Sequence, residues 1–187
     1  MFTHEVRFPI APFGPRLGTR GEGASAQEAL LRALCALPEP GRLIVDLNGV
    51  DVLSGSFADE AIAIPCARVA AGEHGDRYML IDTPHRDLAD DLGYKLERRR
   101  LAMLCLVDGG WSVLGPLPPP MMETLALIIE RGETTPKDVA SALGIRHNAC
   151  LHRIARLADL RLIRREEVGS AGPYPSYRLA SLLDGGG

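Results

Sequence analysis

The residues from Thr134 to Tyr177 constrain the fold of this chain more than any other stretch, because helix start and stop signals follow one another there. Thr135 is suited to cap a helix, Pro136 suits the first turn, and Asp138 completes a capping-box spacing. Gly144 offers a left-handed stop. The pattern predicts a helix that begins at Pro136 and ends in a tight turn.

A second helix is predicted after this turn, in which Ile145 is expected to be buried. Cys150, Ile154 and Leu157 fall on one face of that helix at a period of about 3.6 residues. The positions roughly opposite are Asn148, His152, Ala155 and Arg156. One face is therefore expected to pack and the other to reach outward.

A hairpin is predicted after Leu160. The run RLIRREE is rich in strand formers and arginine, GSAGPYP has turn chemistry, and SYRLASLL returns as a strand or helix. This order of helix, turn, helix and basic hairpin resembles the winged helix-turn-helix domains of bacterial transcription regulators. The resemblance covers the last third of the chain, and it places the first helix of such a domain at Met121–Glu130.

Positive charge is concentrated in the same stretch, although the whole chain carries a formal charge of -3. From Arg146 to Arg165 the arginines face only Asp159 as an acidic residue before the wing. The resemblance implies double-stranded DNA as partner, contacted by Arg146, His147, Asn148, His152, Arg153 and Arg156 on the helix and by Arg164, Arg165 and Arg178 on the wing strands. An ordinary solvated face or a protein-docking surface is the alternative interpretation. A DNA reader of this size is expected to act as a homodimer on half-sites about 34 Å apart.

The first part of the chain reads as alternating strands and helices, which predicts a small sheet with crossover helices and an α/β fold. Strands are predicted at Glu5–Ile10 on an edge, at Arg42–Leu47, at Arg77–Asp82 and in a hairpin around Asp108–Gly110. Helices are predicted from Ser25, from Ser56 with an interruption at Pro65, and from Thr83–Pro84 to near Gly93. The predicted domains are 1–114 and 121–184, joined by a stiff proline-rich linker at 115–120.

Two segments of the first domain suggest a family. LIVDLNGVDVLSGSFADEAI, at Leu43–Ile62, resembles the core of the STAS-like domains of unknown function, relatives of the sulfate-transporter and anti-sigma-factor-antagonist fold. LGTRGEGASAQEAL resembles the entry to their first helix, and the likeness covers Leu17 to Leu96. In the antagonists a serine at the start of the second helix is phosphorylated, so the resemblance implies a switch at Ser54 or Ser56. Here the motif is Phe-Ala-Asp-Glu rather than that of the antagonists, and helix capping is the alternative role for Ser56.

Several function classes are not favoured by the sequence. The four cysteines are far apart and form no C-x-x-C pair, and His147, Cys150 and His152 do not converge on one helix face, so neither a disulfide framework nor a metal is expected. Asp59 and Glu60 are adjacent and point about 100° apart, which does not suit a cooperating acid and base. The glycine-rich Arg16–Ala26 lacks a phosphate-loop pattern. We therefore expect no enzymatic activity and no cofactor. No membrane-spanning run or signal-peptide pattern is present, and a cytoplasmic location is expected.

The leading hypothesis is a DNA-binding transcriptional regulator whose STAS-like half binds a partner or transmits a signal. The alternative is a non-enzymatic protein-interaction adaptor whose winged domain serves for docking or dimerisation. A weaker hypothesis places a small ligand near Arg20 and Ser56.

Overall fold

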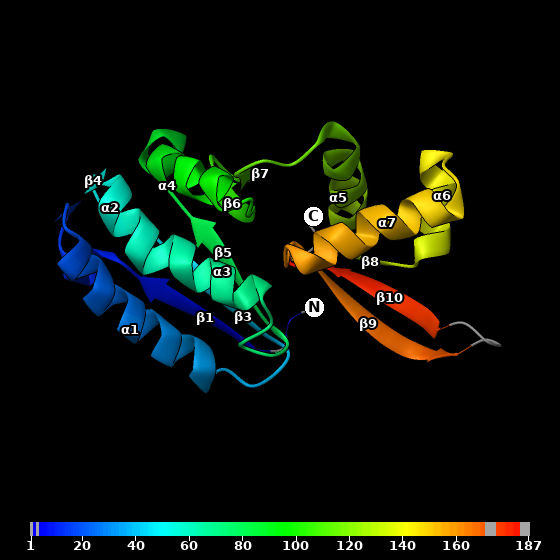
Figure 1. Cartoon of the computed structure of the whole chain (residues 1–187), viewed down its shortest axis with the longest axis horizontal. Coiled ribbons are helices and arrows are strands. Elements are labelled where there is room, and N and C mark those ends of the chain that lie inside the picture. The colour runs from blue at the N-terminus through cyan, green and yellow to red at the C-terminus, as the bar shows by residue number, and fades with distance from the viewer. Residues whose placement is uncertain (1, 3, 171–174, 184–187) are drawn as a thin grey trace. The chain divides into compact units, whose positions relative to one another are not determined.

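The computed structural model describes residues 2, 4–170 and 175–183 (Figure 1). The chain divides into two compact units, Phe2–Pro116 and Leu117–Gly187. The division falls inside the predicted linker. Pro119 and Pro120, however, belong to a helix rather than to an extended connection. A proline at the start of a helix loses no hydrogen bond, so these two residues begin a helix instead of extending the linker between the two units.

A five-stranded sheet forms the frame of the first unit among its described residues, in the order β1-β3-β5-β6-β7. The strands are β1 (His4–Pro9), β3 (Gly41–Asp46), β5 (Arg77–Asp82), β6 (Met103–Val107) and β7 (Gly110–Leu114). The first four run parallel and β7 runs antiparallel to β6. The α/β expectation and the edge position of the first strand are thus confirmed. A short parallel pair, β2 (Arg16–Leu17) with β4 (Val52–Leu53), and the 3-10 turn η1 (Ala11–Phe13) lie outside this sheet.

The strands β6 and β7 form the hairpin that was predicted around Asp108–Gly110. Asp108 and Gly109 connect them with φ values of 52° and 72°, the left-handed pair that two-residue turns between twisted strands require. Leu106 lies opposite Trp111 across the hairpin. Because β6 also pairs with β5, the hairpin closes the sheet of the first unit.

Helices cover one face of this sheet (Figure 1). They are α1 (Arg20–Ala36), α2 (Gly55–Ala58), the π-helical segment η2 (Asp59–Ala63), α3 (Ile64–Ala70) and α4 (Arg86–Arg98). Leu30, Phe57 and Ile62 of the helices are fully buried in one core with Val45 and Ile81 of the strands. This core contains the apolar residues at helical and strand periods that the sequence pattern indicates.

The first helix begins earlier than predicted. Thr19, not Ser25, is its N-cap: the Thr19 hydroxyl accepts from Glu22 N at 3.2 Å, and Glu22 Oε2 accepts from Thr19 N at 2.9 Å. Both Thr19 and Ser25 are followed by a glutamate three residues later, so each has the spacing of a capping box. The structure forms the box that lies nearer the N-terminus, between Thr19 and Glu22. Gly23 suits the resulting helix, because a Cβ there would lie 2.9 Å from Glu60 Cβ. The glycine-rich stretch is therefore helical surface against η2.

The second helix also begins earlier than predicted, with its cap two residues before Ser56. Ser54, not Ser56, is the N-cap of α2, and its hydroxyl accepts from Phe57 N at 3.2 Å and donates to Gly18 O at 2.7 Å. The predicted interruption near Pro65 takes the form of η2, after which α3 continues. A π turn accommodates the absent N–H and the ring of a proline without ending the helix.

The last helix of this unit starts later and runs further than predicted. Thr83 N donates to Leu106 O at 3.0 Å, which extends the strand pairing past Asp82 and keeps Pro84 outside α4. The helix also continues through Gly93. Leu92 and Leu96 are both fully buried, and their burial outweighs the cost of one glycine, about 1 kcal/mol.

The second unit combines three helices with a three-stranded antiparallel sheet over its described residues. Its elements are α5 (Pro119–Arg131), β8 (Glu133–Thr134), α6 (Pro136–Leu143), α7 (His147–Asp159), β9 (Ile163–Ser170) and β10 (Pro175–Ser181). The sheet order is β8-β10-β9. The segment SYRLASLL is thus mainly a strand, while the middle of the predicted turn (171–174) and the end of the predicted domain (184) lie outside the described residues. The buried apolar residues of this unit include Leu125, Ile128, Val139, Cys150, Ile154, Leu157, Leu162 and Leu179.

Candidate nucleic-acid interface

Helix α7 is positioned by the turn that precedes it. The Thr135 hydroxyl accepts from Asp138 N at 3.3 Å at the start of α6, and Gly144 ends α6 in the left-handed conformation, at φ 62°. Ile145 N then donates to Ala140 O at 3.1 Å, which closes the turn. Both predicted signals are confirmed. Ile145 itself is half-buried rather than buried, because its side chain lies at the edge of a surface hollow beside Gly144.

The two faces of α7 are as predicted. Cys150, Ile154 and Leu157 are buried, at 0%, 1% and 0% exposure. The exposed side chains at and beyond its start include Arg146, His147, Asn148, His152 and Arg156. This face combines arginine, histidine and asparagine with no carboxylate before Asp159. Such a surface can donate to phosphates and pair with base edges.

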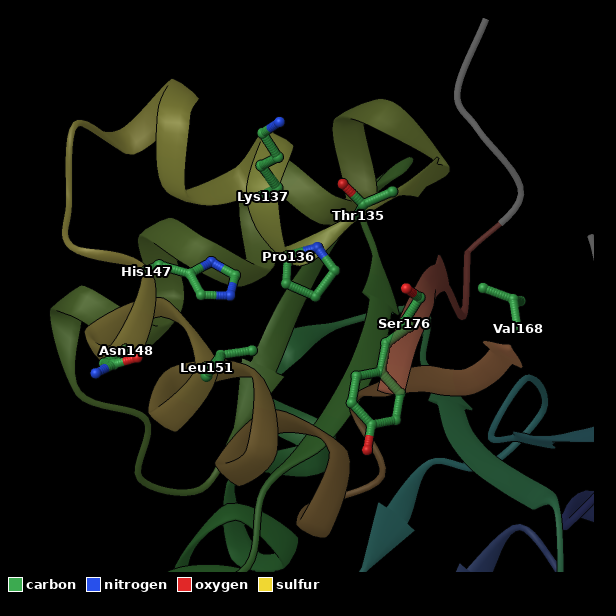
Figure 2. A pocket seen from close by; sticks show the side chains of 9 residues that line it. Thr135, Pro136, Lys137, His147, Asn148, Leu151, Val168 and Ser176 are labelled. Atoms are coloured by element: carbon green, nitrogen blue, oxygen red, sulfur yellow. The ribbon is translucent and has the colours of Figure 1, made fainter. Parts of the chain in front are cut away.

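A groove of about 690 Å³ runs beside the N-terminal ends of α6 and α7 (Figure 2). Its lining comes from Thr135, Pro136, Lys137, His147, Asn148, Leu151, Val168, Ser176 and Tyr177. Two predicted residues, His147 and Asn148, therefore share a wall with β9 and β10. Thr135, Lys137, Ser176 and Tyr177 belong to this groove as well, and sequence reasoning missed them as site residues. Lys137 could have been predicted from its place in the first turn of α6. The sequence contains no pattern that would have identified Ser176 and Tyr177.

The strands β9 and β10 hold their arginines differently. Arg165 is exposed and its guanidinium lies over the Tyr177 ring, 4.3 Å from the centroid. Arg164 pairs with Glu166 at 3.3 Å, and its side chain is only 22% exposed. Arg178 is exposed and stands opposite Glu166 in the register of β9 and β10. Arg165 and Arg178 therefore point outward, and Arg164 is turned towards its own strand.

Arg153 does not belong to the outward face of α7. Its Nη1 donates to Pro120 O at 3.1 Å, to Thr124 Oγ1 at 3.3 Å and to Glu123 Oε2 at 3.3 Å. Thr124 is fully buried. The expectation that Arg153 reaches a ligand is corrected, because its side chain fastens α7 to the first turns of α5.

The three side chains of α7 that were considered as metal ligands do not lie together: Cys150 is buried, and His147 and His152 are exposed. Cys150 Sγ lies 3.5 Å from Pro136 O inside the unit, and burial raises the pKa of this thiol. Throughout the part of the chain that the structure describes, no group of three or more His, Cys, Asp and Glu side chains is arranged to hold a metal ion.

The first unit has a groove of its own, which the sequence did not suggest. It measures about 700 Å³ and lies where the loops after β3 and β5 meet the start of α4. Four carboxylates line it, those of Asp51, Asp87, Asp90 and Asp91. The carboxyl ends of parallel strands are where α/β sheets usually place ligands.

The two candidate switch serines differ in accessibility. The Ser54 hydroxyl is engaged by Gly18 O and Phe57 N and the residue is half-buried, whereas Ser56 is exposed. The nearby carboxylates have separate partners: Arg99 donates to Asp59 Oδ1 at 3.0 Å, and Arg20 lies 3.8 Å from Glu60. Asp59 and Glu60 thus each pair with an arginine.

Comparison of the chain with protein-family models, curated proteins and solved structures found no match. Among the described residues, none of the helices has both the length and the apolar content needed to cross a membrane.

Proposed function

We propose that the second unit is a winged helix-turn-helix domain that reads double-stranded DNA, and that the first unit is a STAS-like domain that senses a signal or binds a partner. The order α5-β8-α6-α7-β9-β10, with the sheet order β8-β10-β9, supports the winged arrangement. The single observation that carries the proposal is the outer face of α7, which has no carboxylate before Asp159, beside a groove walled by the hairpin strands.

The exposed residues of α7 suit direct reading of base edges. Asn148 offers an amide that can pair with adenine, and Arg146 and Arg156 offer guanidinium groups for guanine or phosphate. His147 and His152 add further donors on the same face. The major groove admits one helix of this width.

The hairpin would meet the sugar-phosphate backbone beside that helix. Arg165 is held by the Tyr177 ring, which orders a long side chain before any phosphate is bound. Arg178 is the second outward cation of these strands. Lys137, at the groove edge on α6, adds a third. These contacts would fix the position of α7 without adding sequence preference.

One domain of this kind covers a short DNA site, so we propose a homodimer on a palindrome with half-sites about 34 Å apart. Regulation would come from the first unit. Ser56 is the better-placed serine for a phosphate, because it is exposed at the start of α2 and a phosphate adds close to two negative charges there.

Selection of bound sequences from a random double-stranded DNA pool tests the proposal. We expect enrichment of a palindrome by the full chain and loss of that enrichment in an Arg146→Ala/Arg156→Ala variant. The charge-matched control is Arg32→Ala/Arg98→Ala, two exposed arginines of the first unit, which should leave the selected sequence unchanged. No enrichment by the unmodified chain at low salt would contradict the proposal and favour the adaptor alternative.

A further inference from the structure

The groove beside α6 and α7 contains more apolar surface than a contact with DNA phosphates requires. Pro136 and Leu151 line its helix side, and Val168 lines its strand side (Figure 2). Val168 is 46% exposed and is one of three large apolar residues that the described part of the chain leaves open to solvent. DNA phosphates are met by polar and charged groups. Apolar residues that gather in a hollow instead indicate a site for an apolar ligand.

The helix side of the groove also carries a cation and a hydrogen-bond donor. Lys137 and His147 both line it and both are exposed. None of the described residues that line the groove is acidic. The Asp138 carboxylate accepts from Thr135 Oγ1 at 2.7 Å, and Asp138 is not among those lining residues. The groove therefore combines an apolar surface with a positively charged edge.

The strand side of the groove is fixed by a stacked pair. The Arg165 guanidinium lies 4.3 Å from the centroid of the Tyr177 ring, which lines the groove. Glu167 stands opposite Tyr177 in the register of the hairpin and offsets the Arg165 charge, which leaves the charge of the lining to Lys137. A wall that is already ordered lowers the cost of binding. The volume of about 690 Å³ falls within the range of small-molecule sites, about 300–1,000 Å³.

We propose that this groove binds an aromatic monocarboxylate, and that the bound acid competes with DNA. The rings of the acid lie against Leu151 and Val168. Its carboxylate pairs with Lys137 and accepts a hydrogen bond from His147, which are charge-assisted contacts. The competition rests on the proposed reading of DNA, because the acid takes the space beside α7 and the cation that a DNA backbone would use. The binding of the acid does not depend on that reading.

Titration of the nitrogen-15-labelled full chain with 2-naphthoate at pH 7, without DNA, tests the site. We expect the backbone amide signals of Lys137, Leu151, Val168 and Tyr177 to shift and to saturate together. The neutral 2-naphthamide has nearly the same shape and should bind about threefold more weakly, as for the loss of one solvent-exposed ion pair. Shifts confined to other parts of the chain, or equal affinities for the two compounds, would overturn the proposal.

Substitutions at two exposed positions separate the charge from the apolar contact. Lys137→Gln should weaken the binding of 2-naphthoate about threefold and leave that of 2-naphthamide unchanged. Val168→Ser replaces two methyl groups by one hydroxyl and should weaken both compounds about fivefold. Arg131→Gln removes an exposed cation at the end of α5, outside the described lining. This matched control should bind both compounds as the unmodified chain does, and full affinity for 2-naphthoate in Val168→Ser would refute the apolar contact.

The competition is measured with the duplex selected from the random pool. At ten times its dissociation constant, 2-naphthoate should lower the apparent affinity of the full chain for that duplex about tenfold, as mass action requires of mutually exclusive ligands. An unchanged affinity for DNA would overturn the competition. A chain that binds 2-naphthoate in the groove and no DNA would contradict the proposed function and the competition together, and would leave the site established.

Discussion

At the scale of single residues, two nearby residues of the same type have different physical roles. Ser54 and Ser56 are two residues apart and both stand near the start of α2. Only the Ser54 hydroxyl is bonded on both sides, as donor to Gly18 O and acceptor from Phe57 N. The Ser56 side chain is exposed. We therefore expect Ser54 to matter for stability and Ser56 to be the serine that is accessible to modification.

Replacement of each serine by alanine should separate these roles. Ser54→Ala is expected to lower the unfolding free energy of the first unit by about 1 kcal/mol, the usual value of an N-cap. Ser56→Ala should change it by less than about 0.5 kcal/mol, as at other surface positions. Urea unfolding of the two variants measures the difference. Equal losses for both would show that the Ser54 cap contributes little.

At the scale of elements, prediction succeeded where one signal dominated. The strands Gly41–Asp46 and Arg77–Asp82 are short apolar runs with clear ends. The helix Pro136–Leu143 has one cap and one glycine stop. Such elements are specified by local chemistry, which a sequence contains in full.

Prediction failed where signals competed or where contacts came from elsewhere. Two capping patterns follow each other at the start of α1, at Thr19 and at Ser25, and the sequence does not rank them. Gly93 was predicted to end the helix, because the sequence does not show that Leu92 and Leu96 beside it are buried. The outer face of α7 followed from its period, but the attachment of Arg153 to α5 joins residues about 30 positions apart, as the separations of its bonded pairs show. No local pattern encodes such a pairing.

Arg153 and Arg156 should therefore respond differently in DNA binding. We expect Arg156→Ala to reduce the slope of log affinity against log salt by about one, as for a lost phosphate contact. Arg153→Ala should weaken binding with an unchanged slope, because it loosens α7 rather than removing a contact to DNA. Titrations of the selected duplex at several salt concentrations provide the slopes. A slope reduced equally by Arg153→Ala would place that side chain on the DNA.

At the scale of the whole molecule, the two units differ in charge. Residues 2–116 contain 12 Lys and Arg against 16 Asp and Glu, while residues 117–187 contain 9 against 8. The proposed DNA reader is thus close to neutral overall and depends on where its arginines lie. The acidic balance belongs to the first unit, including the carboxylates of its groove. A bulk isoelectric point would not reveal either property.

The hairpin of the first unit has a consequence for optical measurement. Trp111 is the one tryptophan of the chain, half-buried in β7 opposite Leu106. Its emission reports on Phe2–Pro116 alone, whereas far-ultraviolet circular dichroism sums the helices of both units. We expect the two signals to give different unfolding midpoints in urea, since compact units with separate cores need not melt together. Coincident midpoints would instead mean that both units unfold as one, and a Trp111→Phe/Tyr177→Trp variant, with its tryptophan in the second unit only, would then follow that unit through the same transition.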